Sequence, residues 1–489
     1  MAVDELHRER AKLDQLERQE RHLVEKLFEI RKAIEAQKLK IDNLRGPSAI
    51  TRLPTELLLH IFTLCIRHPK FPEKSLHRIV GVSRSWRDIV WNNPSFWTSI
   101  KVTRRQRKKS LKKQLERSRE ALLDIWVEGW VYTRKYDVLA KFRGLLGVIL
   151  PHANRWRSLA IDTDSMGTKF VESTFTELNH LSIPFLREFS MNFEDDDDDP
   201  PRLAYPDFPL PAHAPALQHL TLKTPFQLDT FMALPTLKTL HLTFAEADHS
   251  PPVISMLTPA QSLTSLVLNG DSTGWTLKRN DLHLPLLEHL TLELNTPLPF
   301  LEAVIAPKLR YVRLYFHYPV EFNTIEGKFR DVHDLSLDIN DRSAESLCRA
   351  FPGVRRVQLS AWDIFFFVAG THESAGILER RLPTVIIDQW LNLETVTLDD
   401  LGRKWLGRWE FDDPIVKWLE GRQESGLSRL HVRLSQIEGD GDGLPGYYSF
   451  DLGTYCNVEV FDILVGEFFV ESEPYVFPQS DLRPLGQLK

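Results

Sequence analysis

The chain has 489 residues, of which 42% are hydrophobic and 26% are charged, and its formal net charge is -6. That composition is typical of a globular protein and argues against general nucleic-acid binding, while three cysteines are too few for a disulfide framework or a metal cluster. The charged N-terminus and the lack of a run of 18 apolar residues argue against a signal peptide and a membrane span. We therefore expect a soluble protein of the cytoplasm, the nucleus or both, with neither membrane nor nucleic acid as a partner.

Residues 4–44 contain neither Pro nor Gly and repeat apolar residues in heptads, which predicts a coiled-coil helix as a first domain over residues 1–48. The helix should end at Gly46 and Pro47. Its apolar seam has to pack on something, so we expect either self-association through residues 4–44 or folding back onto its own chain. The a positions are Leu6, Leu13, Glu20, Leu27, Ile34 and Ile41, and the d positions are Glu9, Leu16, Leu23, Ile30, Gln37 and Leu44.

The segment TRLPTELLLHIFTLCI, residues 51–66, predicts a helix from Pro54 onward that is apolar over most of its circumference. The apolar arc covers about 220°, roughly twice the width that a helix needs to pack on one core. Two more short helices are predicted before Pro94. About fifty residues in three short helices cannot bury so many large side chains internally, so we expect another chain to cover part of this surface.

Three blocks in this region, LPTELLLHIF (53–62), VGVSRSWRDIV (80–90) and PSFWTSI (94–100), together resemble an F-box. The resemblance implies a three-helix domain over residues 49–100 that docks on the Skp adaptor of a Skp–cullin–F-box ubiquitin ligase. The sequence departs from the family pattern at Ser83, where Cys is frequent, and at Trp91, where a small residue is usual. The resemblance assigns the docking ridge to Leu53, Pro54, Leu57, Leu58, Ile61 and Phe62, with Val82 and Trp86 as its support.

The basic stretch KVTRRQRKKSLKK, residues 101–113, has no interleaved aromatic residues of the kind that stack on bases. Its leucines continue at helical spacing into the following residues. The pattern favours a solvated helix face at the start of the next domain over a nuclear-localisation signal.

From residue 123 onward, the frame Leu-x-x-Leu-x-Leu recurs with conservative substitutions. Its last two apolar positions alternate with period 2, which predicts short strands with one buried face. The recurrence resembles leucine-rich repeats and implies a solenoid of parallel strands over residues 101–489. The repeat's asparagine survives only at Asn295 and Asn340, with Asp271 as a substitute, so we expect an irregular solenoid. The copies lie at residues 217–222, 237–242, 263–268, 287–292, 309–314, 332–337, 354–359, 393–398 and 427–432, with weaker ones at 156–161, 186–191 and 458–463.

The predicted fold is therefore an α+β chain: a coiled-coil helix, a three-helix F-box and an irregular leucine-rich-repeat-like α/β solenoid. Side chains between the buried leucines should lie on the concave face of the solenoid. We expect an unknown target protein to bind there, with Arg313 and Tyr315 as hot spots because Arg and Tyr dominate such sites; the alternative is that these are merely solvated strand residues. The predicted target-binding residues are Lys223, His241, Arg313, Tyr315, Gln358 and Arg433.

No GxSxG, HExxH, Walker-type or CxxC motif is found in the sequence. The acidic stretches at 194–201 and 438–446 are expected to be solvated loops, not cation sites. We expect no enzyme activity, cofactor or metal. The resemblance implies a substrate-recognition subunit of the ligase, linked through the adaptor to a cullin; the alternative is a ligase-independent scaffold that uses the coiled coil and the solenoid.

Overall fold

The computed structural model describes residues 2–45, 50, 53–67, 75–130, 137–164, 177–178, 181–194, 214–223, 235–244, 257–273, 275–316, 318–339, 343–360, 363–368, 385–399, 414–437 and 456–463. The chain divides into two units, Met1–Asn92 and Asn93–Lys489. The domain boundary predicted after residue 100 falls inside a strand, Ser99–Thr103, that belongs to the second unit. None of the described helices is long and apolar enough to cross a bilayer.

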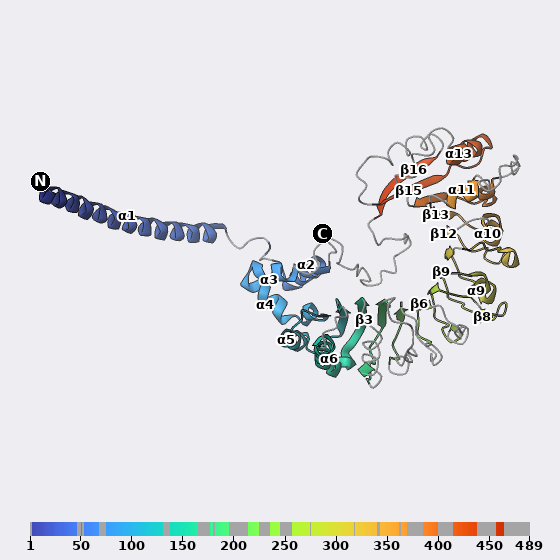
Figure 1. Cartoon of the computed structure of the whole chain (residues 1–489), viewed down its shortest axis with the longest axis horizontal. Helices are drawn as coiled ribbons and strands as arrows, with labels where there is room; N and C mark the ends of the chain where they lie inside the picture. Colours follow the sequence, from blue (N-terminus) through green and yellow to red (C-terminus); the bar gives the residue numbers. More distant parts are fainter. Residues whose placement is uncertain are drawn as a thin grey trace. The chain divides into compact units, whose positions relative to one another are not determined.

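The first unit is helical. Helix α1 (Ala2–Arg45) extends over 44 residues, and α2 (Thr55–Arg67), α3 (Ser75–Val82) and α4 (Arg84–Asn92) are short (Figure 1). The predicted long N-terminal helix is therefore confirmed, and so are the three short helices. Whether α1 pairs with another helix stays a prediction.

The second unit is built on a large parallel sheet, which confirms the predicted parallel strands. Among the described residues, fourteen strands form this sheet in chain order (Figure 1). Each of the twelve predicted frames overlaps one strand, and β1 and β2 precede them. The strands are β1 (Ser99–Thr103), β2 (Leu123–Glu128), β3 (Trp156–Asp164), β4 (Glu188–Glu194), β5 (His219–Leu222), β6 (Thr239–Phe244), β7 (Ser265–Gly270), β9 (His289–Leu294), β11 (Tyr311–Phe316), β12 (Asp334–Ile339), β13 (Arg356–Ser360), β14 (Thr395–Asp399), β15 (His431–Ile437) and β16 (Asn457–Ile463).

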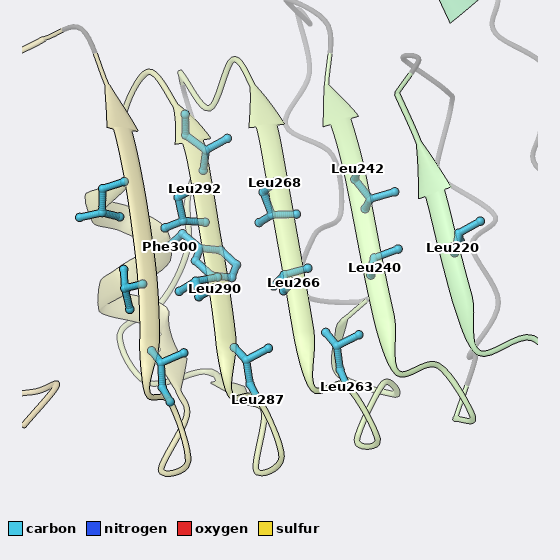
Figure 2. Packing of buried hydrophobic residues seen from close by; sticks show 14 of the residues in the cluster. Leu220, Leu240, Leu242, Leu263, Leu266, Leu268, Leu287, Leu290, Leu292 and Phe300 are labelled. Carbon is cyan, nitrogen blue, oxygen red and sulfur yellow. The ribbon is translucent and has the colours of Figure 1, made fainter. Parts of the chain in front are cut away.

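Leucines on alternate strand positions form the core of this unit. Because successive side chains of a strand point to opposite faces, Leu290 and Leu292 of β9 are buried while Thr291 between them is half-buried on the other face. The strands pair in register, so Leu240, Leu266 and Leu290 stand side by side on β6, β7 and β9. Figure 2 shows these leucines in rows across neighbouring strands, with Phe300 among them.

Helices cover the leucine face of the sheet. They lie along one side of it (Figure 1), and their buried residues join the same hydrophobic cluster. In α5, Leu111 and Leu115 are buried while the lysines are exposed, so the basic stretch does continue into a solvated helix face. The helical segments are η2 (Pro94–Trp97), α5 (Lys108–Ser118), α6 (Asp137–Ile149), η3 (Leu150–Arg155), α9 (Leu298–Ala303), η5 (Asn323–Ile325), α10 (Ala344–Ala350), α11 (Asp363–Val368), η6 (Ile386–Gln389) and α13 (Pro414–Glu424); β8 (Leu282–His283) and β10 (Val304–Ile305) form a separate parallel pair.

Asp363 is a buried carboxyl group at the start of α11, with only 2% of its surface exposed. Its Oδ2 accepts a hydrogen bond from the backbone N–H of Ile339 at 3.2 Å, and its own N–H donates to Ser360 Oγ at 3.1 Å. Burial raises the pKa of Asp363 to about 7, and the nearby charge of Asp338 adds to the increase, although the hydrogen bonds oppose it.

The Asp363 carboxyl predicts a pH dependence of stability. An aspartate in the unfolded chain has a pKa of about 4, so between about pH 4 and 7 the folded state binds more protons than the unfolded state, and the free energy of unfolding falls as the pH rises. Asp363→Asn keeps the acceptor for Ile339 N–H and removes the titration. We expect it to be more stable than the wild type at pH 8 by about 2–4 kcal/mol and to show a flatter profile from pH 5 to 7. Urea unfolding followed by circular dichroism checks this; parallel wild-type and variant profiles would contradict it.

Candidate protein-docking site

Helix α2 begins at a rigid proline. The carbonyl of Pro54 accepts hydrogen bonds from the N–H groups of Leu57 at 3.1 Å and Leu58 at 3.2 Å, which closes the first turn. Proline lacks a backbone N–H, but the first N–H groups of a helix have no intrahelical partner, so Pro54 costs no hydrogen bond here. Glu56 in the first turn complements the positive end of the helix dipole. The orientation of α2 about its own axis is then set by what it packs against.

One side of α2 packs on α3 and α4. Leu58 and Phe62, one turn apart, are buried, and the Phe62 ring lies 4.7 Å from the Trp86 ring of α4 at an angle of 54°. Trp86 is placed by the start of α4, where its backbone N–H donates to Ser83 Oγ at 3.1 Å. Ser83, one of the two departures from the family pattern, therefore serves as the N-cap of the helix that carries Trp86.

Another side of α2 carries an apolar row that the described residues leave uncovered. Leu57, Ile61 and Leu64, here called the outer stripe, are 51%, 38% and 58% exposed. Their i, i+4, i+7 spacing puts them on one helix face, about 110° from Leu58 and Phe62. An apolar helix face with these spacings is the feature by which a helix docks on another protein.

The residues predicted for adaptor docking are thus divided between two faces. Leu57 and Ile61 lie on the outer stripe, Leu58 and Phe62 lie inside, and Trp86 is half-buried beneath α2. Leu53 is half-buried and Pro54 is exposed at the start of α2.

Val82, which was predicted to support the docking ridge, lies at the surface of the domain. Val82 is the last residue of α3 and is 61% exposed, whereas Ile79, one turn earlier, is buried. Ile79 fills the interior position, and Val82 is available to a partner together with the outer stripe.

Two exposed residues were not among the predicted site residues. Leu64 completes the outer stripe, and its position seven residues after Leu57 was the signal for it. Trp91 of α4 is also exposed, and the Arg87 guanidinium lies 5.9 Å from the centre of its ring. Trp91 stands where the family pattern usually has a small residue. This large aromatic side chain adds apolar surface that no spacing rule predicts.

The face of the sheet opposite the leucines, here called the open face, carries all six residues predicted to bind a target. The strand register places His241, Arg313, Gln358 and Arg433 in a single row that crosses the strands. Tyr315 lies two residues further along its strand, and Lys223 directly follows β5.

Distance along the row separates these residues into groups. Arg313, Gln358 and Arg433 stand on every second strand, β11, β13 and β15, so successive members are about 10 Å apart along the sheet. His241 on β6 is three strands, or about 14 Å, from Arg313. The structure brings Arg313, Tyr315 and Gln358 within reach of one partner segment, whereas Lys223 and His241 belong to a separate part of the open face.

Polar side chains on the open face bridge neighbouring strands. Arg356 Nη2 donates to Asp334 Oδ2 at 2.8 Å, Gln358 Nε2 donates to Asp399, and Asn269 Nδ2 donates to Glu293 Oε2 at 2.8 Å. Burial lowers the pKa of His241 to about 4, and the charge of Lys223 lowers it further, so His241 is neutral at pH 7. The resulting surface is polar, with charges of both signs, and presents hydrogen-bonding groups in a row.

Some sequence predictions concern the ends of strands. Asn295 Nδ2 donates to Asp271 Oδ1 at 3.2 Å, so these two residues, singled out in the sequence, contact each other. Asn340 lies outside the described residues, as do residues 195–201 and 438–446 of the two acidic stretches.

Comparison with known proteins assigns the region that carries the outer stripe to a domain family. A protein-family model described as F-box-like matches residues 50–103, a range that includes α2, α3, α4, η2 and β1. No curated protein matches the chain. The chain therefore contains an F-box-like domain, and domains of this family generally bind Skp-type adaptors. The match indicates a role in protein–protein interaction and leaves the rest of the chain unassigned.

Proposed function

We propose that this chain is the substrate-recognition subunit of a Skp–cullin–F-box ubiquitin ligase, active in the cytoplasm, the nucleus or both. One observation carries the proposal: the F-box-like domain exposes Leu57, Ile61 and Leu64 on a single face of α2. Exposed apolar rows of this kind are costly in water and are covered by a partner. The adaptor would cover the outer stripe and would itself carry the cullin.

The open face of the sheet is proposed to hold the target. Leucine frames at the strands, parallel pairing in chain order and helices on the opposite face support an irregular leucine-rich-repeat-like solenoid, an architecture that serves extended binding surfaces. The chain would contribute no catalytic group, cofactor or metal. It would act by holding the target close to the ubiquitin-transferring subunits, which lowers the entropic cost of the transfer step.

Co-purification tests the proposal against the ligase-independent scaffold. The full chain is coexpressed with a Skp adaptor and a cullin, and the complex is isolated through a tag on the chain. If the chain is a ligase subunit, the adaptor and the cullin should be recovered in equal molar amounts with it. Recovery of the chain without adaptor would contradict it and favour the scaffold. Self-association through residues 4–44 is compatible with both hypotheses and is tested separately.

Target binding is expected to depend on the neighbouring pair Arg313 and Tyr315. Truncating two hot-spot residues removes roughly 2 kcal/mol each, so Arg313→Ala combined with Tyr315→Ala should weaken target capture by about 1,000-fold. Quantitative mass spectrometry of proteins retained by the full chain measures this. Tyr318→Ala is the control, because Tyr318 is exposed just beyond β11 and outside its strand positions. Retention of every bound protein by the double variant would show that the target binds elsewhere.

A further inference from the structure

Helix α1 presents an apolar row along most of its length. Every residue from Glu5 to Ile41 is exposed, and the a and d positions of the predicted heptads include Leu13, Leu16, Leu23 and Leu27. All the a and d positions of α1 together are here called the α1 seam. Phe28 is apolar and lies outside the seam. A helix in water gains little stability from propensity alone and depends on packing of its apolar face, so the seam requires an occupant.

We infer that the occupant is a second copy of this chain, paired with α1 as a parallel, in-register, two-stranded coiled coil. The inference builds on the proposed self-association through residues 4–44 and does not depend on adaptor docking.

The flanking charges favour the parallel orientation. In a parallel pair, each g residue meets the e residue five positions later on the other chain, so Glu5 meets Arg10 and Lys12 meets Glu17. Both contacts join opposite charges. Further along, Lys26 meets Arg31 and Lys40 meets Arg45, which are like-charge contacts.

The antiparallel orientation has a less favourable charge pattern. In the alignment with full overlap, g residues face g residues and e residues face e residues. Lys26 then lies opposite Lys26 of the second copy, Lys12 opposite Lys40, and only Glu17 and Arg31 form a pair of opposite charge. The parallel pair balances its two attractive contacts against two like-charge contacts, whereas in the antiparallel pair the like-charge contacts outnumber the attractive one.

Polar residues in the seam lower the stability of the pair. In the parallel, in-register dimer, Glu20 at an a position faces Glu20 of the second copy, and these two like charges weaken the dimer. Ile34 and Ile41 at a, with leucines at three of the six d positions, favour two strands over three or four.

The orientation decides where the two F-box-like domains lie. In a parallel pair, both α1 helices end at Arg45 together, and the nine residues from 46 to 54 limit each α2 to within about 32 Å of that end. In an antiparallel pair, the ends of α1 are separated by the helix length of about 66 Å. The parallel dimer therefore holds two adaptor-docking stripes at one end and gives an assembly of two chains with two adaptors, which engages a target bivalently.

The mass of the full chain tests self-association. Sedimentation equilibrium at micromolar concentration should give twice the 56.7 kDa of one chain. Leu23→Glu combined with Leu27→Glu should give a monomer that still binds the adaptor, and Glu20→Leu should lower the dimer dissociation constant at least ~10-fold. A monomeric wild-type chain, or a trimer or tetramer, would overturn the inference. If the wild-type chain does not bind the adaptor, that result would instead count against the ligase proposal alone.

Disulfide formation tests the orientation. Glu9 occupies a d position, so Glu9→Cys in a Cys65→Ser background should form an interchain disulfide under mild oxidation in a parallel dimer. In the antiparallel alignment, Glu9 faces Ile41 and the disulfide is absent. Arg8→Cys at an outward c position is the matched control. A dimer in which Glu9→Cys forms no more disulfide than Arg8→Cys would overturn the parallel arrangement.

Discussion

Changing Leu57 and Ile61 together to Ala is expected to abolish recovery of the Skp-type adaptor with the full chain. Both side chains lie on the outer stripe, where truncation removes contact area with a partner and leaves the interior of the domain unchanged. At roughly 2 kcal/mol for each hot-spot residue, the double change weakens the complex by about 1,000-fold. Pull-down of purified adaptor and thermal unfolding of the same variant measure the two quantities separately.

Two controls define this result. Leu391→Ala removes a leucine that is 87% exposed in the second unit and should leave adaptor binding unchanged. Phe62→Ala removes a buried ring that packs against Trp86 and should lose binding through unfolding of the domain, at a cost of about 3–5 kcal/mol. The account is contradicted if the Leu57 and Ile61 double variant keeps its adaptor, or loses it only because it melts as the Phe62 variant does.

Gly353→Ala is expected to destabilise the second unit by roughly 3 kcal/mol or more. Gly353 lies in the turn between α10 and β13, and a Cβ there would stand 1.9 Å from the carbonyl oxygen of Arg330 and 3.2 Å from that of Val332. Both are backbone atoms just before β12. The clash is therefore relieved only if the backbone that leads into β13 moves away from the backbone that leads into β12. Urea unfolding of the full chain measures the effect.

The matched control is Gly421→Ala. Gly421 lies inside α13, and nothing lies within 4 Å of the position of its added Cβ. Alanine in a helix interior is favoured over glycine by about 0.5–1 kcal/mol, so this variant should be slightly more stable than the wild type. Equal effects of the two substitutions would show that close backbone approach is not the reason for glycine at 353.

Much of the sheet could be predicted because each strand repeats the same local pattern. Leucines two residues apart, as at Leu290 and Leu292, specify a strand with one buried face without information from elsewhere in the chain. His241, Arg313 and Gln358 each hold the fifth position of their frame, so the frame predicts their common row. Arg433 lies two residues beyond that position of its own frame, and only strand pairing places it in the row.

At the candidate docking site, the sequence alone does not determine which apolar residues of α2 are buried. Leu57, Leu58, Ile61 and Phe62 are all apolar, so composition predicts an excess of apolar surface on α2 but does not say which residues face inward. The contact between Phe62 and Trp86 decides it, and that contact joins two residues that lie 24 positions apart in the sequence. Spacing likewise does not determine that Ile79 takes the interior position of α3 while Val82 is exposed.

The most direct test of the central claim is a calorimetric titration of the full chain with a purified Skp-type adaptor. The account predicts saturable binding of one adaptor per chain, a dissociation constant of about 1 µM or below, and a negative heat-capacity change from burial of the outer stripe. Absence of binding at adaptor concentrations of about 100 µM would contradict the claim that α2 of this chain is an adaptor-docking helix.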